Sequence, residues 1–183
     1  QTNVGNFLKR DEHEFSPGSY SFDLNMNANS YEFQYNINAG DTNEEVFRKL
    51  ARLVNNAHIG LKADIINGSH DMAALRLESK QTGLAPQESA LFKIVPDGSP
   101  ESRQAMQTLG IDAVAAAAEN SSFLLNGTKH HSYSNTFTIN NTFSVTLQGI
   151  TPEHEPATIG FKPGSEAVTD DIESLVDSFN SIL

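Results

Sequence analysis

Between Ser132 and Gln148, the large apolar side chains all fall at odd-numbered positions, and most even-numbered positions carry Ser or Thr. Successive side chains of a β-strand point to opposite faces of its sheet. The stretch therefore predicts one or two strands, broken at Asn140-Asn141, with one apolar face and one uncharged polar face. The apolar residues are Tyr133, Phe137, Ile139, Phe143, Val145 and Leu147.

The same alternation occurs earlier in the chain, on both sides of a helical pattern. Residues 19–37 predict a hairpin with one buried face. In "GDTNEEVFRKLARLVNNA" Thr42 precedes Glu45 by three positions, which is the pattern of a capping box at the start of an amphipathic helix. Residues 61–79 predict a second hairpin with its turn at Asn67-Gly68. The predicted order is strand, strand, helix, strand, strand.

Later segments give shorter signals. "LFKIV" predicts a strand, "ESRQAMQTLG" a short helix that Gly110 stops, and "SFLLNGTKHHSY" a hairpin around Asn126-Gly127. "AVAAAAENSS" has no periodic face, which leaves helix and linker open, whereas "PATIGFK" alternates like a strand. The final helix, expected over 166–183, ends at Leu183 without a carboxyl-terminal cap, so we expect it to continue further.

These elements predict an α+β fold of two small lobes: an antiparallel sheet with one packed helix, then a mainly β lobe, ending in a helix. The first segment is a candidate strand of the second lobe. The predicted ranges are 1–18 for the amino-terminal segment, 19–109 for the α+β lobe, 110–165 for the mainly β lobe and 166–183 for the helix leading towards a helical core.

Composition argues against several classes of function. The net charge is −11 and the Lys and Arg residues are scattered, so we predict neither nucleic-acid binding nor membrane insertion. There is no cysteine nucleophile and no G-x-S-x-G motif. The best metal candidates are His130 and His131 with His154, but neighbouring strand residues point to opposite faces and could not share an ion. We therefore predict no enzyme, no cofactor and no metal site.

The order of the motifs resembles that of a known family. Residues 31–83 resemble the repeated motif of bacterial flagellar axial proteins, in which a capped helix ends in Ile-Asn; Val54-Asn55 stands there. Asn126-Gly127, Ser134-Asn135-Thr136 and the strand at 144–147 follow in the order found in the flagellar filament cap family, also called hook-associated protein 2. "DDIESLVDSFNSIL" resembles that family's return to its helical core.

This resemblance implies the head region of a non-enzymatic protein that is exported without a cleavable signal peptide to the bacterial flagellum. Its expected partners are further copies of itself, in a homo-oligomer at the filament tip, and flagellin, whose assembly it would promote. The candidate motif and interface residues are Asn55, Asn126, Gly127, Ser134, Asn135 and Thr136.

Two alternatives stay open. The first is another flagellar axial protein, flagellin or a hook–filament junction protein, because these share the first motif. The second is a surface adhesin or glycan-binding module for host glycans or mucin. An adhesin needs exposed aromatic rings, whereas the four tyrosines all fall on rows that we predict to be buried: Tyr20, Tyr31, Tyr35 and Tyr133.

Overall fold

The computed structural model describes residues 1–152, 155–159 and 172. The chain divides into two compact units, Gln1–Leu147 and Gln148–Leu183. Where the second unit is described between 155 and 159, it has no regular secondary structure, so the strand predicted by "PATIGFK" is not formed there. Apart from Ile172, the helix predicted over 166–183 lies outside the described residues. The helices and strands below belong to the first unit.

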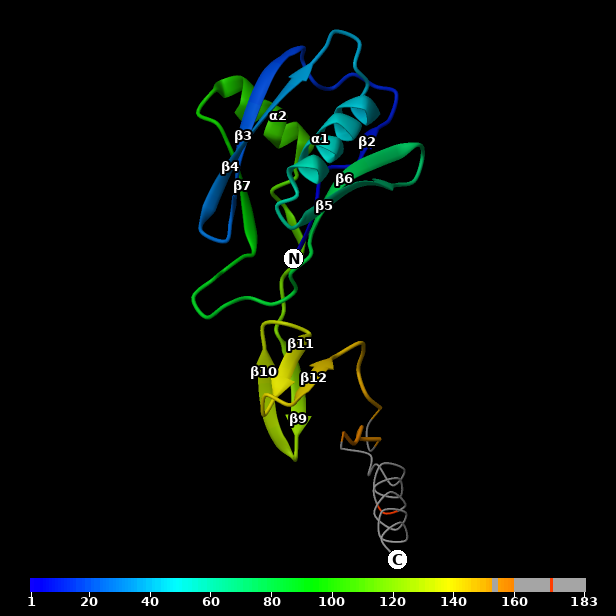
Figure 1. The fold of residues 1–183 in the computed structure, drawn as a ribbon. Coiled ribbons are helices and arrows are strands. Elements are labelled where there is room, and N and C mark those ends of the chain that lie inside the picture. Colours follow the sequence, from blue (N-terminus) through cyan, green and yellow to red (C-terminus); the bar gives the residue numbers. More distant parts are fainter. Residues whose placement is uncertain (153–154, 160–171, 173–183) are drawn as a thin grey trace, which may run out of the picture. The chain divides into compact units, whose positions relative to one another are not determined.

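The first sheet has three antiparallel strands with β3 in the centre (Figure 1). Phe22 of β3 lies opposite Phe33 of the neighbouring strand, and their rings stack with centroids 5.2 Å apart. Both rings are buried, which confirms the hairpin predicted over 19–37. The strands are, in spatial order, β4 (Asn29–Ile37), β3 (Gly18–Met26) and β7 (Phe92–Pro96).

The turn between β3 and β4 has only two residues, because Met26 pairs directly with Asn29. Asn27 and Ala28 both have positive φ angles, 52° and 61°. This is the geometry of a type I′ turn, which matches the twist of the two strands. Ala28 adopts it in spite of the contact that a Cβ atom makes in the left-handed region.

The second sheet is built around β6, which pairs along its length with β5 and at its two ends with β1 and β2. β8 extends the sheet beyond β1. All of these pairings are antiparallel. The strands are β1 (Thr2–Val4), β2 (Leu8–Lys9), β5 (Leu61–Asn67), β6 (Met72–Ser79) and β8 (Val114–Ala116).

Three details of this sheet differ from the sequence-based expectation or refine it. The β5–β6 hairpin is present, but its loop comprises residues 68–71 and the positive φ angles fall on His70 and Asp71, so the two-residue turn predicted at Asn67-Gly68 is wrong. β8 forms within "AVAAAAENSS", where the sequence predicts helix or linker. β1 joins both β6 and β8, and thus elements from both predicted lobe ranges.

Helix α1 (Asn43–Ala57) begins as the sequence predicts, with a complete capping box between Thr42 and Glu45. The helix contacts β4 and the β5–β6 hairpin, and Figure 1 shows its ribbon beside both. Four of its side chains are at most 1% exposed: Val46, Phe47, Leu50 and Val54.

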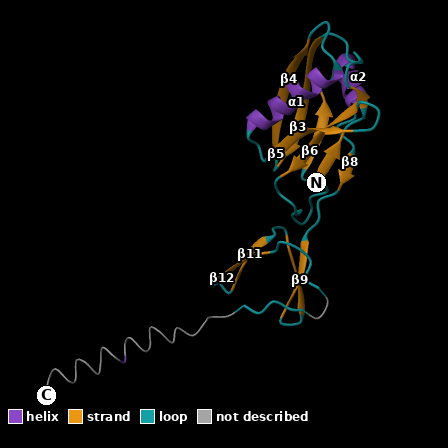
Figure 2. Ribbon diagram, turned by 90° about the vertical axis from the view of Figure 1, so that its right-hand side faces the viewer, coloured by secondary structure: helices purple, strands orange, loops and turns teal. Residues whose placement is uncertain are grey.

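Helix α2 (Pro100–Leu109) is capped at both ends. Ser99 caps its amino end, and Gly110 ends it with a φ of 63°. The helix packs against β3 and β7. In Figure 2 both helices, drawn in purple, lie beside strands of the two sheets, among them β3, β4, β5 and β6. One continuous apolar core, from Phe15 to Ile111, contains residues of both sheets and both helices.

The segment before β3 closes the amino end of α1. The Asn43 side chain is fully buried; its amide nitrogen donates to the Lys9 carbonyl at 2.8 Å, and its amide oxygen accepts from the Glu14 backbone N–H at 3.1 Å. The Asn43 backbone N–H donates to the Glu12 carbonyl. Arg10 pairs with Glu44 at 2.9 Å. The Asn43 backbone bond, and that from the Glu44 N–H to the Arg10 carbonyl at 3.2 Å, satisfy helix N–H groups that have no partner within the helix.

Asp97 connects β3 to the start of α2. Its carboxylate accepts hydrogen bonds from the Ser21 hydroxyl and from the hydroxyl and backbone N–H of Ser99. The Ser21 bond, followed by those from Ser99, lowers the pKa of Asp97 well below its usual value. A lowered pKa means that this contribution to stability is complete at neutral pH and is lost as acid protonates the folded carboxylate.

Asn55 fastens the carboxyl end of α1 to β5. Its side-chain amide donates to the Ala63 carbonyl at 2.8 Å and accepts from the Ala63 backbone N–H at 2.9 Å. The side chain thereby pairs with Ala63 as a neighbouring strand would. His58 then ends the helix in the left-handed conformation, with a φ of 53°.

Replacing Ala28 with glycine should raise the free energy of unfolding by about 1 kcal/mol, because the left-handed conformation costs a non-glycine residue about 1–2 kcal/mol, of which the flexibility of glycine in the unfolded chain takes back a part. Urea unfolding of the folded protein measures this. Ala117→Gly is the matched control: Ala117 is exposed and has no positive φ, so this variant should gain nothing. An equal gain at both positions would contradict the explanation.

Asn55→Ala should lower the free energy of unfolding by about 1–3 kcal/mol, because it removes two hydrogen bonds worth about 0.5–1.5 kcal/mol each. The neighbouring Asn56 is also exposed, and its side chain has no hydrogen-bond partner among the described residues. Asn56→Ala should therefore change stability by less than about 0.5 kcal/mol. Chemical denaturation of the two variants side by side tests the difference, and equal losses would exclude a specific role for Asn55.

Candidate interaction surfaces

Two hairpins follow β8, and the first turns at Asn126-Gly127 as predicted. β9 (Ser121–Leu125) pairs with β10 (Thr128–Ser132), with Leu125 opposite Thr128. The two turn residues have φ angles of 51° and 81°. Asn-Gly is the sequence that best accepts two consecutive positive φ angles.

The second hairpin occupies the stretch of alternating residues. β11 (Thr136–Ile139) pairs with β12 (Phe143–Thr146), with Phe137 opposite Val145. Asn140 and Asn141 lie in the turn with φ angles of 50° and 54°. The break predicted at these two asparagines is confirmed.

The apolar sides of the two hairpins pack on one another. The Phe123 and Phe137 rings stack with their centroids 4.1 Å apart and their planes 9° from parallel. His130 stacks on Phe123 within its own sheet. The apolar row is half-buried and none of its members belongs to the fully buried core. Its residues are Phe123, Leu125, Phe137, Ile139, Phe143, Val145 and Leu147.

The other side of the β11–β12 hairpin is an exposed row of hydroxyl groups. Thr136 lies opposite Thr146, and their hydroxyls are 2.9 Å apart. Thr138 lies opposite Ser144. All four side chains are exposed and uncharged. We call this set the hydroxyl face; it consists of Thr136, Thr138, Ser144 and Thr146.

The structure brings together only some of the motif residues predicted from the sequence. Ser134 and Asn135 connect β10 to β11; the Ser134 hydroxyl accepts from the Thr136 backbone N–H at 3.0 Å, and the Asn135 carbonyl accepts from the Leu147 N–H at 2.7 Å. Ser134, Asn135 and Thr136 thus form one hydrogen-bonded connection. Asn126 and Gly127 lie at the other end of β10, and Asn55 belongs to α1.

Tyr133 corrects one expectation. Its side chain is 52% exposed, although the alternation placed it on a buried row. Tyr133 follows the last residue of β10, where the chain leaves the strand, and strand alternation no longer sets its direction. Tyr20 is buried, and Tyr31 and Tyr35 are half-buried, as expected.

β8 is an exposed sheet edge that sequence reasoning missed. It pairs with β1, and within the described residues no strand pairs with its other edge. Residues 112–117 are all exposed, and Val114 is 54% exposed. The run of small apolar residues from Ala113 to Ala118 was the available signal, but it lacks the alternation by which we recognised the other strands.

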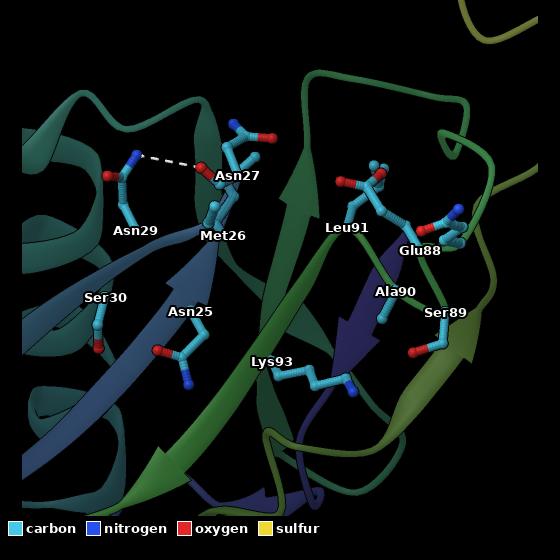
Figure 3. Close-up of a pocket in the computed structure, with 12 residues that line it drawn as sticks. Asn25, Met26, Asn27, Asn29, Ser30, Glu88, Ser89, Ala90, Leu91 and Lys93 are labelled. Carbon is cyan, nitrogen blue, oxygen red and sulfur yellow. Dashed lines mark hydrogen bonds between the residues drawn. The ribbon is translucent and has the colours of Figure 1, made fainter.

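A groove of about 430 Å³ lies between the β3–β4 turn and the loop before β7. Its polar groups are mostly amides and hydroxyls, including Asn25, Asn29 and Ser89. Figure 3 shows these side chains spread along the groove, with Asn29 donating to the Asn27 carbonyl. Its two charged residues, Glu88 and Lys93, form no ion pair with one another. The groove thus offers mainly amide and hydroxyl groups for hydrogen bonding.

Within residues 1–152, 155–159 and 172, no three His, Asp or Glu side chains are arranged to hold a metal ion. His130 and His131 lie opposite Phe123 and Ser122 respectively, and so on different faces of their hairpin.

None of the helices in the described part of the chain combines the length and the apolar character needed to span a membrane.

Comparison with known proteins gave matches in structure alone. No protein-family model matches the sequence, and no curated protein matches it. The D2–D3 domains of the flagellar cap protein FliD from Escherichia coli match with a TM-score of 0.60 and 20% identity, over 82% of this chain and 77% of that chain.

Two larger structures match as well. FliD (HAP2) from Pseudomonas aeruginosa PAO1 matches 99% of this chain and 87% of its own, with a TM-score of 0.59 and 16% identity. The D1-D2-D3 domains of Escherichia coli FliD match 99% of this chain with a TM-score of 0.59 and 19% identity, and this chain spans 56% of theirs. The chain thus has the fold of the D2–D3 head domains of flagellar cap proteins.

Proposed function

We propose that this chain is the head region of a flagellar filament capping protein, which oligomerises at the distal tip of the filament and promotes the assembly of flagellin. The observation that carries the proposal is the match of 99% of the chain to FliD (HAP2) from Pseudomonas aeruginosa. The ordered motifs of the sequence agree with it, from Val54-Asn55 to the strand at 144–147. On this proposal the protein works outside the cell, on the flagellum, and has no catalytic role.

The hydroxyl face is our candidate for contact with neighbouring subunits. Each copy carries a net charge of −11, so copies repel one another over the range of the Debye length. An uncharged patch of hydroxyls lessens this repulsion locally. Hydroxyl groups both donate and accept, so Thr138 and Ser144 can form hydrogen bonds with a neighbour without introducing a like charge.

One observation favours a second candidate function. Tyr133 presents an exposed aromatic ring, and exposed aromatic rings are what an adhesin for host glycans or mucin requires. The amide-lined groove beside the β3–β4 turn adds hydrogen-bonding groups elsewhere on the unit. Binding of glycans or mucin would add to a capping role and would not replace it.

Antibodies raised against this chain should label the producing bacteria at the free tips of their flagella. Gold-labelled electron microscopy measures this directly. Labelling along the whole filament would instead indicate flagellin, labelling at the filament base a junction protein, and labelling of the cell body an adhesin. Absence of tip labelling on intact filaments would contradict the proposal.

Thr138→Lys in the full-length protein should weaken self-association at least about tenfold. The lysine would lose its hydration when the contact forms, and the uncharged hydroxyl face would offer it no carboxylate partner. Gln107→Lys is the matched control: it adds the same charge at an exposed position on α2 and relieves the same net repulsion. Analytical ultracentrifugation over a range of concentrations gives both values. Equal behaviour of the two variants would remove the hydroxyl face from the interface.

A further inference from the structure

The sequence contains two Asn-Gly pairs, Asn67-Gly68 and Asn126-Gly127. The two pairs differ in the contacts that surround them. An asparagine followed by glycine is chemically vulnerable because the next backbone nitrogen can attack the side-chain amide carbon. Glycine offers no side chain to hinder this approach and moves freely in φ and ψ. The two pairs therefore act as an internal comparison of one chemical group in two environments.

Asn67-Gly68 is restrained at the side-chain oxygen of Asn67 and at the backbone nitrogen of Gly68. Arg10 donates a hydrogen bond to the Asn67 side-chain oxygen. The attacking group, the Gly68 backbone N–H, already donates to the Met72 carbonyl at 2.8 Å. The Phe7 ring packs directly on Gly68: a Cβ atom added to this glycine would lie only 2.6 Å from a carbon of the ring. The nitrogen is bonded and the side chain is fixed.

Asn126-Gly127 has none of these restraints. Both residues are exposed at the tip of a hairpin whose strands have five residues each. Within the described residues, the Asn126 side chain has no hydrogen-bond partner, and a Cβ atom added at Gly127 would meet nothing within 4 Å. In a two-residue turn of this type, the N–H of the second turn residue faces solvent, because the closing bonds join the flanking residues.

We propose that Asn126 is a site of spontaneous deamidation in the folded protein, and that Asn67 is protected. The Gly127 nitrogen gives up its proton to solvent base and bonds to the side-chain carbonyl carbon of Asn126. The bond from this carbon to the amide nitrogen breaks, ammonia leaves, and a five-membered succinimide remains. Water then opens the ring to aspartate or isoaspartate, so that amide and water become carboxylic acid and ammonia.

The product changes the hairpin in two ways. Each conversion adds one negative charge to a chain that already carries −11. Isoaspartate also routes the backbone through the Cβ atom, which lengthens a two-residue turn whose φ angles of 51° and 81° suit the twist of its strands. We expect the pairing of β9 with β10 to weaken near the turn in that product. The apolar core, whose residues lie between Phe15 and Ile111 in the sequence, should keep its packing.

The experiment follows both sites by peptide mapping with mass spectrometry, after incubation of the folded protein in mildly alkaline buffer. The Asn126 peptide should convert at least about tenfold faster than the Asn67 peptide, a ratio that corresponds to about 1.4 kcal/mol. In denaturant the two rates should approach one another, because both pairs are then unrestrained. Equal rates in the folded protein, or faster conversion of Asn67, would overturn the proposal.

Two matched variants assign the signal. Asn126→Gln should abolish the fast conversion of the folded protein, since glutamine would have to form a larger ring. Asn67→Gln should leave that conversion unchanged. A fast mass change that persists in Asn126→Gln would place the reaction at another residue and contradict the proposal.

Discussion

The packing of helix α1 against strands from both sheets is the interaction on which the first unit depends. Val46, Phe47, Leu50 and Val54 are withdrawn almost completely from water, and burying such side chains contributes about 1.5–3 kcal/mol each. The sheets around β3 and β6 have no strand in common, so no ladder of strand hydrogen bonds joins them; the Gln1 side chain, beside β1, donates to the Phe92 carbonyl of β7 at 2.9 Å. The helix gives them a shared core, and α2 extends it on the side of β3 and β7.

Local signals were enough to predict the elements around this helix. The capping box at Thr42 and Glu45, the two flanking hairpins and the Asn126-Gly127 turn depend on residues a few positions apart, and each is found in the structure. Contacts across long stretches of chain were not accessible in this way. β1 has three residues and no readable alternation, and it becomes a strand because β6 and β8, which follow more than 60 residues later, pair with it.

The candidate surfaces were predicted in outline and corrected in detail. Strand alternation correctly assigned the hydroxyl face to the outside, since that rule needs only a regular strand. It failed at Tyr133, where the strand has ended. The Asn-Gly turn signal failed at the β5–β6 loop, where contacts from Arg10 and Phe7 accompany a longer turn. Asn55 was recognised from its place in a motif, but its pairing with Ala63 requires knowledge of where β5 lies.

The open edge of β8 has a consequence for how the protein behaves at high concentration. An uncharged edge strand is a template on which strands of other molecules can add, and so it is a hazard for aggregation. Here the template is short: β8 has three residues, and its register with β1 shifts between Thr2 and Asn3. A strand from another molecule could form only a few consecutive backbone hydrogen bonds with this short edge. The shortness of β8 and its shifted register thus guard the molecule against uncontrolled sheet growth.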